Sequence, residues 1–169
     1  ISFAIAPIKS QEVLSPEFKE AGNGVYLFKG DTAEEKQAVW EKFHALHMAG
    51  KVKAAWAVEN GLAEAVMNMS FGNNIGFKAE NADVAWDVLV PGAIVAEMTE
   101  DVEWAVKLGE TTEEAVVVIG DDSATVEELL ALNENVLENV YPNRTKTDEA
   151  EVPVLSAPAI SRVTPKISV

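Results

Sequence analysis

The turn formed by Glu59, Asn60 and Gly61 has the residue types and spacing most suited to ligand chemistry in this sequence. The apolar segment 54–58 is typical of a buried strand, and a helical pattern of apolar residues begins at Leu62. Backbone N–H groups at the start of a helix that follows such a turn often hold phosphate in α/β proteins. One glycine is not a phosphate-binding loop, so the pattern indicates a candidate anion site and no catalytic group.

A second group of possible ligands is Glu41, His44 and His47, which follow one another at three-residue steps. On a helix they can project to a similar side and could hold a metal. His47, however, also lies on the apolar stripe of that segment with Phe43, and no further strong ligand is indicated. We therefore interpret the histidines as packing residues and expect no metal site.

The remaining acidic clusters lack the alternation and glycine of a calcium loop, and we interpret them as solvated turns at 100–103 and 121–122. The chain has no cysteine, which excludes a thiol nucleophile and thiolate zinc sites. No Ser-His-Asp order, Walker loop or dinucleotide fingerprint occurs. The residues thus identify no catalytic group.

Composition narrows the classes of partner. The chain has 169 residues, 48% of them hydrophobic and 24% charged, which is typical of one globular domain. Its 13 basic and 28 acidic residues give a net charge of −15, so nucleic acid and anionic membranes are poor partners. No apolar run is long enough for a membrane span. Because the sequence starts without an initiator methionine, we expect an excised piece of a longer protein.

The elements that must position the turn are a strand, a helix and a second strand. Apolar residues at helical spacing predict a helix from Leu62, with Ala65, Val66 and Met69 on the same face. Gly72 is expected to end this helix as a left-handed C-cap, and residues 73–77 to turn directly into the next strand.

The N-terminal third predicts further elements by similar signals. Residues 2–7 suggest a short strand, Ser15-Pro16 a single helical turn, and residues 25–28 a central strand. Thr32 and Glu35 have the spacing of a capping box, which predicts a helix that ends at Gly50.

The second half predicts strands in hairpin order. Segments 84–89 and 93–98 flank Pro91-Gly92, and segments 104–108 and 115–119 flank residues 109–112. A second capping box, Thr125 with Glu128, predicts a last helix that stops at Pro142. Residues 143–169, rich in Pro, Ser and Thr, read as a linker or a surface-draped tail. Together these elements predict an α+β fold with helices packed on a sheet.

Three motifs in this order resemble phosphoribosylformylglycinamidine synthase. They are LSPEFKEAG at 14–22, GLAEA at 61–65 with MSFGN at 69–73, and LGETT at 108–112. The resemblance is to the C-terminal domain of the second module that is similar to aminoimidazole ribonucleotide (AIR) synthetase, and it covers residues 1–142. It implies a three-layer α/β/α fold with a mixed, partly ferredoxin-like sheet, and a tail, 143–169, that leads towards a glutaminase domain.

In that family, the whole enzyme uses ATP and magnesium to convert formylglycinamide ribonucleotide and glutamine to the amidine in purine biosynthesis. The resemblance therefore implies a cytoplasmic ligase as the parent protein, with the remaining domains of that chain and the downstream glutaminase as partners.

The sequence departs from the family where the ligand would bind. The family motif is similar to His-Asp-x-Ser-Asp-Gly-Gly-Leu, whereas residues 56–62 are WAVENGL, one residue short. A gap at the glycines aligns Trp56 with the His, Ala57 with the Asp and Glu59 with the Ser. Without a gap, Ala55 and Trp56 take the first two places. Neither alignment supplies the His or the metal-binding carboxylate.

We therefore expect a mainly architectural domain with a vestigial nucleotide site at Glu59, Asn60 and Gly61, without tightly bound ATP or magnesium and without activity of its own. Two alternatives stay open. One is a non-catalytic binding or interaction module. The other is the equivalent domain of another ATP-using member, such as a selenophosphate synthetase or thiamine-phosphate kinase.

Overall fold

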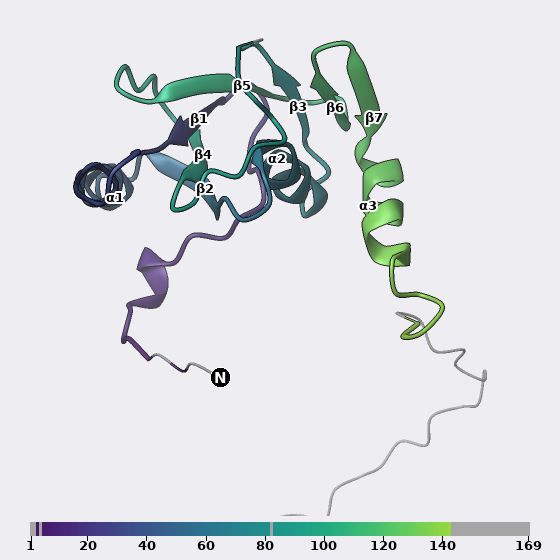
Figure 1. Cartoon of the computed structure of the whole chain (residues 1–169), viewed down its shortest axis with the longest axis horizontal. Helices are drawn as coiled ribbons and strands as arrows, with labels where there is room; N and C mark the ends of the chain where they lie inside the picture. Colours follow the sequence, from purple (N-terminus) through teal and green to yellow (C-terminus); the bar gives the residue numbers. More distant parts are fainter. Residues whose placement is uncertain (1–2, 4, 82, 143–169) are drawn as a thin grey trace, which may run out of the picture.

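The computed structural model describes residues 3, 5–81 and 83–142, and shows three helices against one seven-stranded sheet (Figure 1). The helices are α1 (Ala33–Met48), α2 (Leu62–Phe71) and α3 (Val126–Asn135), and a 3-10 turn spans Ser10–Glu12. The strands, whose order in the sheet is β2-β4-β1-β5-β3-β6-β7, are β1 (Gly24–Phe28), β2 (Val52–Ala57), β3 (Gly76–Ala79), β4 (Ile94–Met98), β5 (Val106–Thr112), β6 (Val116–Ile119) and β7 (Asp122–Thr125).

The sheet is mixed and contains a split β-α-β unit. Strands β1 and β2 both pair antiparallel with β4, so they run parallel to each other with β4 between them. Helix α1 makes the connection, which is the arrangement of ferredoxin-like folds. Strand β3 pairs antiparallel with β5 and parallel with β6. The mixed, partly ferredoxin-like sheet implied by the resemblance is confirmed.

Alternation along β1 divides the core between the two faces of the sheet. Val25 and Leu27 belong to the core cluster that includes buried residues of α2, whereas Tyr26 and Phe28 belong to the cluster that α1 covers. On the α1 side, the Phe28 and Phe43 rings meet edge to face with centroids 5.1 Å apart. Helices therefore cover both faces, and the predicted three-layer α/β/α arrangement is confirmed.

The two capping boxes predicted from sequence are present. Thr32 Oγ1 accepts from the Glu35 N–H while the Glu35 side chain accepts from the Thr32 N–H, and Thr125 and Glu128 do the same for α3. The predicted strand at 25–28, the helix from Leu62 and the strand after it are also confirmed.

The predicted hairpins are wrong. Residues 84–89 form turns instead of a strand, with Val84 and Trp86 packed against the core and Val88 and Leu89 exposed. Residues 109–112, expected to be a turn, lie inside β5. Strands β5 and β6 do not pair with each other because β3 lies between them. A local pattern of apolar segments cannot reveal such an insertion.

Five smaller predictions also fail. Residues 3 and 5–7 form no strand, and residues 1, 2 and 4 lie outside the described residues. Ser15-Pro16 begins no helical turn, and a bend lies at residues 16–17 instead. Gly72 keeps helical angles, with φ −63°, and the left-handed residue is Asn74, with φ 55°. Helix α3 ends at Asn135, well before Pro142. Asp122, expected in a solvated turn, begins β7. The predicted tail, 143–169, lies outside the described residues.

Candidate functional site

The turn before α2 is closed by the chain's own backbone. Gly61 is the N-cap residue of α2, with φ 137°, and the helix has no side-chain cap. The N–H groups of Leu62 and Ala63 both donate to the Trp86 carbonyl, each at 3.0 Å. These are the donors that an anion at a helix N-terminus would use. Trp86 belongs to the loop of residues 80–92. This loop therefore places a backbone carbonyl where an anion would bind.

Position 61 favours glycine, because a larger residue would not fit there. A Cβ at Gly61 would lie 3.2 Å from the Trp86 carbonyl oxygen, and the positive φ strains any L side chain. Gly61 is buried, whereas Glu59 and Asn60 are exposed. The structure thus brings the three candidate residues together on one turn, but it directs the helix donors to Trp86.

A cavity of about 400 Å³ lies beside this turn and is lined by Leu27, Lys29, Leu62 and residues of the loop 80–92. Four valines, Val84, Val88, Val90 and Val106, make much of its wall. Its charged lining residues are Lys29 and Asp83, which offset each other. A polyphosphate would need more positive charge or a metal than this lining offers.

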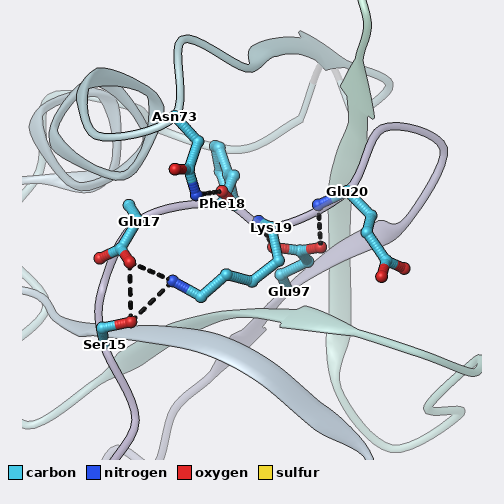
Figure 2. A network of polar contacts seen from close by, with 7 residues as sticks. All are labelled: Ser15, Glu17, Phe18, Lys19, Glu20, Asn73 and Glu97. Carbon is cyan, nitrogen blue, oxygen red and sulfur yellow. Dashed lines mark hydrogen bonds and ion pairs between the residues drawn. The ribbon is translucent and has the colours of Figure 1, made fainter.

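A second polar site, which the sequence did not reveal, is centred on Glu97 of β4 (Figure 2). Its side chain is fully buried and accepts from the backbone N–H of Lys19 at 2.7 Å and of Glu20 at 3.1 Å. The Asn23 amide donates to the same carboxyl at 2.6 Å. Burial of a carboxyl group is costly unless donors surround it, so this one fixes the loop of residues 14–23 onto the sheet.

Two further groups hold the same loop. Thr111 Oγ1 accepts from the Asn23 N–H at 3.0 Å and donates to the Glu20 carbonyl at 2.7 Å. At the end of α2, the Phe18 N–H donates to the Met69 carbonyl and the Asn73 amide donates to the Phe18 carbonyl, both at 2.7 Å. Figure 2 shows the Asn73 and Glu97 contacts on either side of the loop.

The motifs that carry the family resemblance therefore meet in space. The loop 14–22, residues 69–73 and residues 108–112 supply Phe18, Asn73 and Thr111 to one network. These hydrogen bonds run between groups of the chain itself, so the network holds the loop 14–23 on the sheet and on α2. In the sequence, the signal for this network is Glu97, an acidic residue inside the otherwise apolar segment 94–98.

On the exposed side of the loop, Lys19 Nζ donates to Glu17 Oε1 at 2.5 Å and to Ser15 Oγ at 2.7 Å. The Lys19 ammonium, the Glu17 backbone N–H and the Ser15 hydroxyl together lower the pKa of Glu17 to about 2. This cluster is local to residues 15–19 (Figure 2).

In the described part of the chain, no group of three His, Cys, Asp or Glu residues could hold a metal ion. The His44 and His47 rings have centroids 6.5 Å apart, and His47 Nε2 lies 2.8 Å from the Glu12 carbonyl oxygen. Among the described residues, no helix has the length and apolar character needed to cross a membrane.

The fold matches part of several solved PurL structures. PurL of Thermotoga maritima complexed with AMPPCP superimposes with a TM-score of 0.59 and 16% identity, over 93% of this chain and 32% of that chain. The PurLQS structure from the same organism gives 0.59 and 14%, again over 93% and 32%. The structure titled phosphoribosylformylglycinamidine synthase II from that organism gives 0.58 and 14% over the same shares.

At these identities the likeness shows the fold, and the chain spans about a third of the length of the PurL chains. No protein-family model matches the chain. No curated protein matches it either.

Proposed function

We propose that this chain is an architectural domain of a larger enzyme of the phosphoribosylformylglycinamidine synthase type, and that its own nucleotide site is vestigial. The larger enzyme would couple ATP hydrolysis to transfer of nitrogen from glutamine to formylglycinamide ribonucleotide. Support comes from the shared fold with PurL, structures of which are titled as complexes with ATP and with FGAR. The observation that carries the architectural role is the Trp86 carbonyl on the N-terminus of α2.

Energetics favour the loop over an anion at this turn. A ligand phosphate would have to displace the Trp86 carbonyl from two N–H groups and also approach Glu59. Two unit charges about 4 Å apart repel by roughly 4 kcal/mol at an effective dielectric constant near 20. A helix terminus favours an anion by only about 0.3–1 kcal/mol. Neither Trp56 nor Ala57, at the family's metal position, can ligate magnesium.

The remaining expectations follow from the proposal. ATP and magnesium would bind elsewhere in the parent enzyme, and the glutaminase that supplies ammonia would be a separate domain, since this chain has no cysteine to form a glutamyl thioester. The neighbouring domains of the parent chain and this glutaminase would be its partners, in the cytoplasm where purines are made.

Calorimetry of the full 169-residue chain with magnesium and ADP tests the vestigial site. We expect no measurable binding, and we expect Glu59→Ser to restore little because the metal ligand is still missing. A dissociation constant in the low micromolar range, lost in Glu59→Ala or Asn60→Ala, would show a live site and overturn this part of the proposal.

Gene deletion tests the parent enzyme separately. We expect a strain without the gene to require added purines, and the Glu59→Ala gene to restore growth as well as the unchanged gene does. Normal growth of the deletion strain without purines, in the absence of a second synthase gene, would overturn the assignment. Failure of the Glu59→Ala gene alone would contradict only the architectural role.

A further inference from the structure

An apolar groove runs between α2 and α3, away from the turn and from the Glu97 network. Its larger part has a volume of about 480 Å³, with Met67 and Phe71 on the α2 side and Leu129 and Leu132 on the α3 side. A smaller part, about 160 Å³, continues over β6 and β7 and shares Met67 and Leu129 with the first. Figure 1 shows α3 at the edge of the molecule beside these strands.

Helix α3 and the turns after it expose apolar residues along this groove. Leu132 lines the groove with 70% of its surface exposed. Val136, Leu137, Val140 and Tyr141 are also exposed. Only Leu132 of these residues lies in α3, which ends at Asn135, and the other four follow the helix in turns and a bend. Exposed apolar residues gathered in this way are typical of a contact site.

The groove wall also holds an unsatisfied acceptor. Glu64 Oε1 accepts from the Asn68 amide, while Glu64 Oε2 is buried and has no hydrogen-bond partner among the described residues. Both residues line the groove. A buried acceptor without a donor is destabilising, so a backbone N–H that an occupant of the groove brings to the Glu64 carboxyl would be stabilising.

We propose that residues 152–160 of the same chain, VPVLSAPAI, dock in this groove as an extended segment. The segment is uncharged and mostly apolar, and its two prolines favour an extended backbone. Such a segment covers apolar surface and keeps free N–H groups at its non-proline residues. Its chemistry therefore matches both the apolar wall and Glu64.

The connection is long enough. Residues 136–142 span at most about 25 Å of chain from the end of α3 at Asn135. The nine residues 143–151 can extend by about 30–32 Å at 3.3–3.6 Å each, which is enough to bring residue 152 back to that helix. Because the segment is tethered, its effective concentration at the groove is in the millimolar range, so weak contacts suffice to hold it.

A second copy of the chain fits the groove less well. Each copy carries a net charge of −15, and α3 itself carries Glu127, Glu128 and Glu134. Two such helices face to face would repel, whereas the uncharged segment 152–160 adds no charge beside them. Charge thus favours the segment within the chain over association between chains.

The absence of native cysteines makes a disulfide test clean. Leu132→Cys is combined in the full chain with Val154→Cys or, because adjacent residues of an extended segment face opposite sides, with Leu155→Cys. The control pairs use Glu134→Cys, which lies about 200° around the helix from position 132 and is exposed. Oxidation is followed by non-reducing gels and mass spectrometry.

We expect at least one Leu132→Cys pair to form an intramolecular disulfide about tenfold faster than its Glu134→Cys control, because docking raises the local concentration on one side of the helix only. Equal rates for test and control would overturn the proposal, and so would disulfides formed mainly between chains, which would instead indicate a second copy.

Hydrogen exchange of the unchanged chain gives an independent readout. We expect amides of 152–160 to be protected, and Leu132→Lys to remove that protection while the amides of β1 and β4 stay protected. Exchange of 152–160 at the rate of a free peptide in the unchanged chain would contradict docking.

Discussion

The two ends of helix α2 are closed in different ways. At its C-terminal end, the Met69 carbonyl and the Asn73 amide hold the loop 14–23, whose other side is fixed by the side chains of Glu97 and Thr111. At its N-terminal end, a backbone carbonyl of the loop 80–92 takes the helix donors and no side chain caps the helix. Side chains thus hold the loop at one end of the helix, whereas at the other end the backbone alone closes it.

This difference shows why the two ends of α2 should tolerate substitution to different extents. Changes in the Glu97 network would leave buried donors without acceptors, which is costly at every position. Residues 59 and 60 are exposed, so replacements there cost little in stability. We therefore expect the fold to tolerate substitutions at residues 59 and 60 and to be destabilised by substitutions in the Glu97 network.

The largest effect is expected at Glu97. Glu97→Ala leaves three donors, two of them backbone N–H groups, without their acceptor. At about 1–3 kcal/mol each, the free energy of unfolding should fall by roughly 3–9 kcal/mol. Urea denaturation measures it. Glu100→Ala is the control, because it removes only an exposed ion pair with Lys51 and should cost less than about 1 kcal/mol. Equal losses in the two variants would show that the network does not hold the loop.

At the other end of α2, Gly61→Ala tests the closure by Trp86. We expect a loss of about 2–3 kcal/mol, because the new Cβ meets both backbone strain and the Trp86 carbonyl. Gly50→Ala is the matched control: Gly50 also has positive φ, but a Cβ there meets nothing within 4 Å, so about 1 kcal/mol is expected. If thermal unfolding shows the same loss for both, the carbonyl contact contributes nothing.

A smaller effect is expected at Thr111. Thr111→Val keeps the shape but removes the hydroxyl that bonds to Glu20 and Asn23, which should cost about 1–3 kcal/mol. Thr99 offers the comparison, since its hydroxyl bond to the Lys51 carbonyl is exposed. Thr99→Val should change the unfolding free energy by no more than about 0.5 kcal/mol. A Thr111→Val protein as stable as Thr99→Val would place the loop's anchorage in Glu97 alone.

A contrast between local and distant contacts also explains which parts of the fold the sequence could predict. The capping boxes at Thr32 and Thr125 pair residues three apart, so a local pattern was sufficient. Trp86 closes α2 from a loop that lies 24 residues further along the chain. Segment 84–89 has the apolar residues of a strand, but only Val84 and Trp86 of it pack against the core, while Val88 and Leu89 are exposed. The parallel contact of β3 with β6, which separates β5 from β6, is equally non-local. Contacts of this kind override local preference.

The candidate site likewise has one part that the sequence predicts and another that it does not. The turn of Glu59, Asn60 and Gly61 and its place before a helix could be predicted, because glycine and the change of hydrophobic period are local signals. The Glu97 network could not be predicted, since Glu97 lies 74–78 residues along the chain from its partners Lys19, Glu20 and Asn23. An acidic residue in an apolar strand signals a buried polar site without naming its partners.

The smallest effect concerns the exposed edge of the loop 14–23. The pKa of Glu17 is about 2, chiefly because of the hydrogen bond from Lys19, so Lys19→Met should raise it towards the ordinary value of 4.5. Carboxyl titration by NMR measures this change, and Ser15→Ala should move the pKa less.

A pKa lower in the folded than in the unfolded chain stabilises the fold above pH 4.5, and this contribution is lost as the pH falls from 4.5 towards 2. Because solvent reaches both side chains, we expect it to be below about 1 kcal/mol. Lys19→Met should therefore flatten the acid limb of the stability profile only slightly. An acid limb that disappears in Lys19→Met would instead place the main anchorage of the loop at its exposed edge.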